Sequence, residues 1–92
     1  MSTQQVFDSV WDALEDDPVE CANMKLRSSL MRAVKDWFDS SNMTQTEAAT
    51  KLKVSRSNLS SLLNGHIHLF TIDRLVNMLE AAGKHVELKV AA

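Results

Sequence analysis

Apolar side chains recur every three or four residues in five stretches of the chain, which is the spacing of one helix face. We expect these helices at about residues 4–15, 18–40, 44–52, 55–64 and 71–82. Near the C-terminus the period changes, because Val86, Leu88 and Val90 alternate with charged residues, as in a β-strand. The pattern predicts a mainly α-helical chain with one C-terminal strand.

Capping residues mark where several of these helices begin and end. Asp17 precedes Pro18, a combination typical of a helix start. Thr44 and Glu47 have the spacing of a capping box, in which each side chain binds the other residue's backbone N–H. Gly83 follows the last apolar stripe and predicts a left-handed helix end.

The longest predicted helix, residues 18–40, supplies most of the expected core. Its inward face is predicted to comprise Met24, Leu26, Leu30, Met31, Ala33, Val34, Trp37 and Phe38. The basic residues Lys25, Arg27, Arg32 and Lys35 are interpreted as a solvated helix face. Later in the chain, Ile67 and Phe70 are expected to fill the core beneath the helix that precedes them.

The stretch from Thr44 to Gly65 reads as two short helices joined by a tight turn. Leu59, Leu62 and Leu63 form the inner side of the second helix. Its outer side carries the short or hydrogen-bonding residues Arg56, Ser57, Asn58, Ser60 and Ser61. Arg can bind guanine through two hydrogen bonds and Asn can bind adenine in the same way, so this surface suits base edges. The alternative is that these residues only cap and solvate a helix.

The charge distribution separates an acidic arm from a mildly basic body. Residues 1–20 contain six acidic and no basic side chains, whereas residues 21–92 contain all ten Lys and Arg and six acidic side chains. A basic body is compatible with phosphate contacts, although its excess charge is modest. With 92 residues and 45% apolar content, we expect one domain with a small core and a partner subunit.

The sequence also excludes several classes. The lone Cys21 permits no internal disulfide, and the lack of a signal peptide or long apolar run favours a cytoplasmic, non-membrane protein. His66 and His68 lack a nearby third ligand, so we expect no metal. No catalytic signature or glycine-rich phosphate loop is present, and we expect neither enzymatic activity nor a cofactor.

Residues 45–65 resemble the helix-turn-helix of the XRE, or lambdoid phage repressor, family. The matching positions are Gln45 at the first position, Ala49 at the small fifth position, Val54 and Ser55 at the turn exit, Leu59 and Leu62 in the core, and Gly65 after the second helix. Residues 20–90 are similar to short XRE proteins, including HigA-like antitoxins. The resemblance implies a lambda-repressor-like bundle of about five helices and a sequence-specific DNA-binding transcriptional repressor.

The resemblance also assigns residues to the DNA. It places Ser55, Arg56, Ser57, Asn58 and Ser61 at base-reading positions, and Thr44, Gln45, Asn64, His66 and His68 at phosphate-contacting positions. Two departures from the family pattern matter. Lys53 stands where Gly is common, so we expect a positive φ there, at a cost of about 1 kcal/mol. Histidines replace the basic residues after the second helix, so we expect weaker phosphate anchoring.

We expect three segments: an acidic amphipathic arm (1–17), the DNA-binding domain (18–84) and a dimerisation strand (85–92). The sequence offers no second strand to pair with the last segment. A lone strand leaves backbone groups unpaired, so we expect Val86, Leu88 and Val90 to pair with the same strand of a twofold-related copy. The partner DNA would then be a palindromic operator read by a homodimer.

Two interpretations of the arm stay open. Its apolar residues Val6, Phe7, Val10, Trp11 and Leu14 could dock on their own domain or the sister subunit, or they could bind a partner protein. The favoured function is the antitoxin and autorepressor of a type II toxin–antitoxin operon, with a small basic RelE/HigB-like toxin bound partly by the arm. The alternatives are a stand-alone phage-type or host XRE repressor, and a protein-interaction module that has lost DNA binding.

Overall fold

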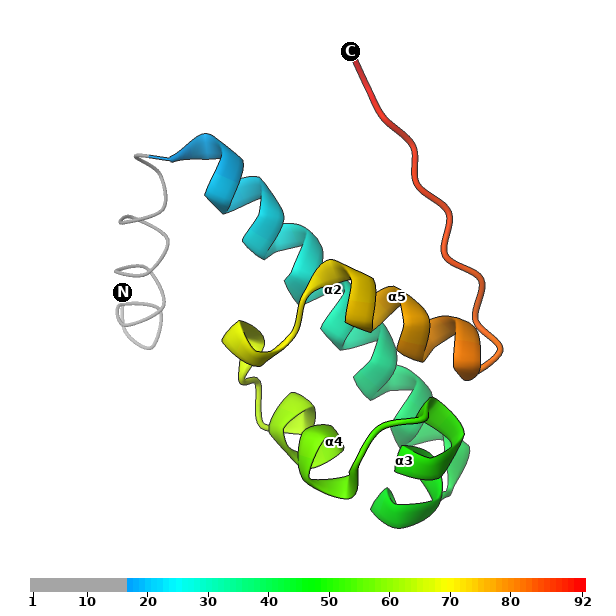
Figure 1. The fold of residues 1–92 in the computed structure, drawn as a ribbon. Helices are drawn as coiled ribbons and strands as arrows, with labels where there is room; N and C mark the ends of the chain where they lie inside the picture. The colour runs from blue at the N-terminus through cyan, green and yellow to red at the C-terminus, as the bar shows by residue number, and fades with distance from the viewer. Residues whose placement is uncertain (1–16) are drawn as a thin grey trace.

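The computed structural model describes residues 17–92, which form four α-helices and one short 3₁₀-helix (Figure 1). The elements are α2 (Pro18–Ser41), α3 (Gln45–Leu52), α4 (Arg56–Leu63), η1 (Ile67–Leu69) and α5 (Ile72–Ala81). The mainly helical prediction is confirmed for this part of the chain. The helix expected at residues 4–15 lies outside the described residues. None of the described helices is long and apolar enough to cross a membrane.

Side-chain caps account for where α2, α3 and α5 begin. The Asp17 carboxylate accepts hydrogen bonds from the backbone N–H groups of Val19 and Glu20, at 3.1 and 3.2 Å. At the start of α3, the Thr44 hydroxyl accepts from the Glu47 N–H and the Glu47 carboxylate accepts from the Thr44 N–H, which confirms the capping box. At the start of α5 the Thr71 hydroxyl accepts from the Arg74 N–H at 3.2 Å, without the reciprocal bond of a capping box.

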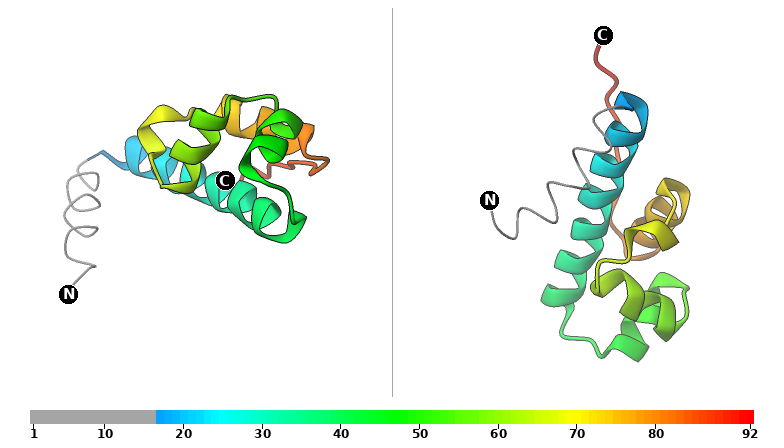
Figure 2. Two further views of the ribbon diagram at one scale, coloured as in Figure 1. Left: turned by 90° about the horizontal axis from the view of Figure 1, so that it is seen from below. Right: turned by 90° about the vertical axis from the view of Figure 1, so that its left-hand side faces the viewer.

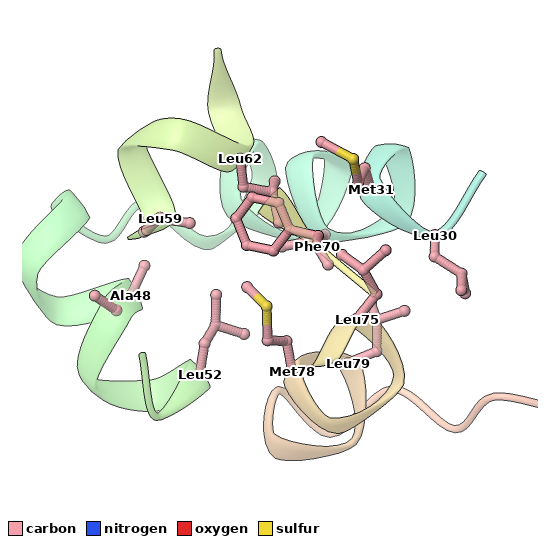
Figure 3. Packing of buried hydrophobic residues seen from close by; sticks show 12 residues of the cluster. Leu30, Met31, Ala48, Leu52, Leu59, Leu62, Phe70, Leu75, Met78 and Leu79 are labelled. Carbon is pink, nitrogen blue, oxygen red and sulfur yellow. The ribbon is translucent and has the colours of Figure 1, made fainter. Parts of the chain in front are cut away.

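The long helix α2 lies along one side of the molecule, and α4, η1 and α5 pack against it (Figure 2). α5 makes the most extensive contact with α2, while α3 packs against α4 and α5. The core is one cluster of buried residues contributed by all four helices and by Phe70, which is 1% exposed (Figure 3). Within residues 17–92 no polar or charged side chain is buried.

The prediction that Ala33 lies in the core is wrong, because Ala33 is exposed. Its neighbour Val34 is fully buried, and successive residues of an α-helix point about 100° apart. The inward face of α2 is therefore narrower than the apolar pattern predicted. Leu26, Trp37 and Phe38 are only half-buried and pack against the edge of the cluster, as does Ile67.

The interpretation of Arg27 as part of a solvated face is also wrong. Its side chain is only 14% exposed, and its guanidinium Nη1 donates to the backbone carbonyls of Ile67 and Phe70, both at 3.4 Å. Its Nε also donates to Asn23 Oδ1 at 2.7 Å. Arg27 therefore ties α2 to the segment between α4 and α5.

A second guanidinium holds the same segment from the other side. Arg74 Nη1 donates to the Leu69 carbonyl at 2.9 Å, and its Cζ lies 5.0 Å from the centre of the Phe70 ring. A cation over an aromatic face is attracted by the negative face of the ring. The short η1 segment is thus fixed by one arginine from α2 and one from α5.

The predicted C-terminal strand is not formed by the described chain. Residues 84–92 have no regular secondary structure, and the Val86 N–H donates to Glu80 Oε2 at 3.0 Å rather than to a neighbouring strand. The physical reason is that the described residues offer no other strand edge. Val86 packs on the core, whereas Leu88 and Val90 are 70% and 94% exposed.

Replacing Arg27 with Ala should lower the free energy of unfolding by about 1.5–3 kcal/mol, the typical value of hydrogen bonds that involve a charged group. Chemical denaturation at 25 °C measures this change. Lys25→Ala is the matched control, because Lys25 is exposed on the same helix, and it should change stability by no more than about 0.5 kcal/mol. Equal effects of the two substitutions would contradict the role given to Arg27.

Candidate nucleic-acid interface

The turn between α3 and α4 is closed by backbone hydrogen bonds. Lys53 adopts φ 62° and ψ 40°, which confirms the positive φ expected there. The Val54 N–H donates to the Ala49 carbonyl at 3.0 Å, and the Lys53 N–H donates to the Thr50 carbonyl at 3.2 Å. This pair of bonds is a Schellman motif, which ends α3 within one residue and directs the chain into α4.

Small buried side chains allow α3 to lie close to α4. Ala48 and Ala49 are buried on α3, together with Leu52 at its end. Leu59 and Leu62 are buried on the facing side of α4, as predicted (Figure 3). The two short helices therefore form one rigid unit, and the other side of α4 is available for contacts.

The exposed side of α4 carries the predicted base-reading residues. Ser55, Arg56 and Ser57 are exposed, while Asn58 and Ser61 are half-buried. Four of the five fall within the N-cap and first turn of α4, and Ser61 follows one turn after Ser57. The Ser55 hydroxyl oxygen accepts from the Asn58 N–H at 3.0 Å, which leaves the hydroxyl hydrogen free to donate to a ligand.

The electrostatics of this end of α4 favour an anion or a hydrogen-bond acceptor. The first turn contains Arg56 and no acidic residue. The N-terminus of a helix carries a partial positive charge, because its first N–H groups have no partner within the helix. The positive charge of Arg56 and the partial positive charge of the helix end therefore both attract a negatively charged or hydrogen-bond-accepting group.

The predicted phosphate contacts fall into two separate places. Thr44 and Gln45 lie at the N-terminus of α3, whereas Asn64, His66 and His68 follow the C-terminal end of α4. Thr44, Asn64, His66 and His68 are exposed, and Gln45 is half-buried. Gly65 adopts φ 82° at the point where the chain leaves α4, and the space around it is open, so backbone conformation accounts for the glycine.

Two polar residues of α5 were missed by the sequence analysis. Arg74 and Asn77 line a hollow of about 480 Å³ together with Ser55 and Asn58. Both residues lie outside the apolar stripe of α5, and their spacing of three positions is the signal that places them on one helix face. Arg74 is half-buried and donates to the Leu69 carbonyl. Asn77 is exposed, so its side chain is the one of the two that a ligand can reach.

A model of a family described as a helix-turn-helix domain matches residues 13–91, which is most of the chain. The matched region contains α2 to α5, the turn at Lys53 and the surface of α4. No curated protein matches the chain significantly.

Proposed function

Since this chain belongs to the helix-turn-helix domain family, a family of DNA-binding regulators, we propose that it is a sequence-specific transcriptional repressor acting on double-stranded DNA. The observation that carries this proposal is the surface of α4. That surface exposes Arg56 and Ser57 on a rigid pair of helices and has no acidic residue in its first turn.

In the proposed complex, the N-terminal half of α4 enters the major groove. Arg56 is exposed and long enough to bind guanine O6 and N7, while Asn58 would bind adenine. Ser55, Ser57 and Ser61 would donate to or accept from base edges. Asn58 is half-buried, so its contact requires close approach of the helix to the base pairs.

Phosphate contacts at both ends of the motif would fix the register of the helix on the duplex. Thr44 and Gln45 would bind one strand through neutral groups, and Asn64, His66 and His68 would bind the phosphates near the other end of α4. Few of these contacts are cationic, so we expect weak non-specific binding and a shallow dependence of affinity on salt.

We further propose that the protein acts as a homodimer on a palindromic operator. The support is the alternation of Leu88 and Val90, 70% and 94% exposed, in a segment that pairs with no strand among residues 17–92. Segment 85–92 would form an antiparallel ribbon with its copy, with Val86 at the point where the ribbon leaves the core. Half-sites would then lie about 34–36 Å apart.

The biological context that we propose is an antitoxin that represses its own type II toxin–antitoxin operon. It is supported by the sequence resemblance to HigA-like proteins and by the acidic composition of segment 1–17. A small basic RelE/HigB-like toxin would bind this segment through Val6, Phe7, Val10, Trp11 and Leu14. We also propose that the chain divides into this acidic N-terminal segment (1–17), a DNA-binding domain (18–84) and a dimerisation segment (85–92).

Arg56→Ala should weaken operator binding by about 1–3 kcal/mol and relax specificity at one base position. Mobility-shift titrations on the protein's own upstream DNA, with every base of the half-site varied, measure both effects. Lys51→Ala is the matched control on α3. Equal loss on operator and random DNA would assign Arg56 to a phosphate, and no shift of upstream DNA by the unaltered protein would favour a module without DNA binding.

Deletion of residues 85–92 should convert the dimer into a monomer, because it removes the ribbon that joins the two copies. Mass measurement by light scattering over a concentration series checks this outcome. A double substitution, Leu88→Lys with Val90→Lys, should have the same effect without shortening the chain. A deletion variant that remains dimeric would rule out the ribbon.

The antitoxin proposal predicts that an adjacent reading frame encodes a small basic protein that is toxic when expressed alone. The two proteins should co-purify, and removal of residues 1–17 should abolish co-purification. Toxin that is still retained by the shortened chain would show that this segment is not the contact.

A further inference from the structure

The backbone of the C-terminal segment has one edge that is held and one edge that is open. The Val86 N–H donates to Glu80 Oε2 at 3.0 Å, so α5 holds the edge on which this N–H lies. Within residues 17–92, the backbone N–H groups of Glu87 and Lys89 have no hydrogen-bond partner. In a strand, the N–H groups of successive residues point to opposite edges. A strand formed by this segment would therefore present Glu87 and Lys89 together on the open edge.

We propose that the open edge pairs with the same edge of a second copy in one defined register, centred on Leu88. The proposal rests on the homodimer proposed above and adds which residues meet across the ribbon. Leu88 lies opposite Leu88 of the second copy. On either side of this centre, Val86 lies opposite Val90 and Glu87 lies opposite Lys89.

The apolar pattern selects this register. The two strands run in opposite directions, so a step forward along one strand is a step back along the other. Only when Leu88 is at the centre does each of Val86, Leu88 and Val90 meet another member of the same set. A shift by one residue would place Val86 opposite Lys89, and a shift by two would place Val90 opposite Lys84.

The same register pairs opposite charges on the other face of the ribbon. Glu87 and Lys89 alternate with the apolar residues and therefore point away from their face. With Leu88 at the centre, Glu87 of each copy lies opposite Lys89 of the other. Opposite charges that face each other across a ladder stabilise the pairing, whereas like charges destabilise it. The segment is thus complementary to itself in charge, which favours a second copy over an unrelated partner.

The bond to Glu80 also fits this register. In an antiparallel ladder, pairs of opposite residues that exchange backbone hydrogen bonds alternate with pairs that exchange none. Because Glu80 takes the Val86 N–H, Val86 and the opposite Val90 form a pair without hydrogen bonds. Glu87 and Lys89 then supply the hydrogen-bonded pairs. The two Leu88 residues meet in a pair without hydrogen bonds, where the Cα atoms lie about 4.5 Å apart.

The apolar face of the ribbon would also cover part of α2. A two-stranded ribbon is marginally stable in water unless it packs against another element such as a helix. Val86 lines a hollow of about 520 Å³ together with the exposed Ala33 and the half-buried Trp37 of α2, and charged residues also line it. Val90 of the second copy lies beside Val86 on the same face, so it would contact Ala33 and Trp37. Both residues were predicted to lie in the core, and a second copy accounts for their apolar character.

Disulfide formation in the full-length protein tests the register. Cys21→Ser first removes the native thiol. Leu88→Cys then places two thiols at the centre of the ribbon, where the Cα separation is one that a disulfide can bridge. Copper–phenanthroline serves as the oxidant, and covalent dimer is followed on non-reducing gels.

Val90→Cys is the matched control, because Val90 is the more exposed residue, at 94% against 70% for Leu88. In the proposed register the two Val90 residues are offset by about 13 Å along the ribbon. We expect Leu88→Cys to form covalent dimer about ten times faster than Val90→Cys, because only its thiols lie within disulfide range. Equal rates, or faster cross-linking at position 90, would overturn the register.

Charge exchange tests the pairs on the other face. Glu87→Lys places two lysines opposite each other, and Lys89→Glu does the same with two glutamates. We expect either substitution to raise the dimer Kd about tenfold, since two pairs per dimer change from attraction to repulsion. Mixing the two variants should yield the heterodimer in preference to either homodimer. A chain with both substitutions should dimerise as tightly as the unaltered protein. No preference on mixing, or no recovery in the double variant, would overturn the pairing.

Ala33→Glu tests the contact with α2. It should raise the dimer Kd, measured by analytical ultracentrifugation, about tenfold, because the contact would bury a charge. Ala22→Glu is the matched control, since Ala22 is an exposed alanine of the same helix that does not line the hollow. Equal effects of the two substitutions would overturn this contact. A chain that is monomeric at every concentration would overturn the homodimer itself, whereas a dimer that does not cross-link faster at position 88 would overturn the register alone.

Discussion

Burial of the Phe70 ring is the interaction on which the remaining arrangement depends. Phe70 lies in the connection between α4 and α5, is 1% exposed, and belongs to the cluster to which all four described helices contribute. Its burial draws the backbone around it inward, where carbonyl groups need donors. Arg27 of α2 supplies such a donor to the part-buried Phe70 carbonyl, and Arg74 of α5 adds a bond to the exposed Leu69 carbonyl. The position of α4 is therefore fixed at its end by this connection as well as at its start by the turn after α3.

Features determined by neighbours in sequence were predicted correctly. The caps at Asp17 and Thr44 involve partners two or three residues away, and the left-handed conformation at Lys53 is a property of that residue's own backbone. Arg27 could not be interpreted from its surroundings in the sequence, because its carbonyl partners lie forty and more residues further on. The predicted strand was not found for a different reason. The apolar residues do alternate, but a strand also needs the edge of another strand to pair with.

For the candidate interface, the sequence indicated which residues α4 carries but not how the neighbouring elements lie beside them. The sequence indicated which residues α4 presents, and their exposure agrees with that prediction for Arg56 and Ser57. The oxygen atoms of Thr44 and Ser55 accept helix-capping bonds, which leaves each hydroxyl as a donor to a ligand. The sequence could not show that Asn77 of α5 shares a hollow with Ser55 and Asn58, because that proximity arises only when α5 packs against α3.

The left-handed Lys53 has a kinetic consequence for a protein that binds a polyanion. A glycine would adopt this conformation without the cost of about 1 kcal/mol that a residue with a side chain incurs. The lysine instead places an exposed positive charge at the turn, three residues before Arg56 and on a backbone held by the bonds to Ala49 and Thr50. Exposed charges of this kind act mainly during diffusional encounter, where they raise the association rate more than they prolong the complex. Turn stability and speed of encounter are thus set by the same residue.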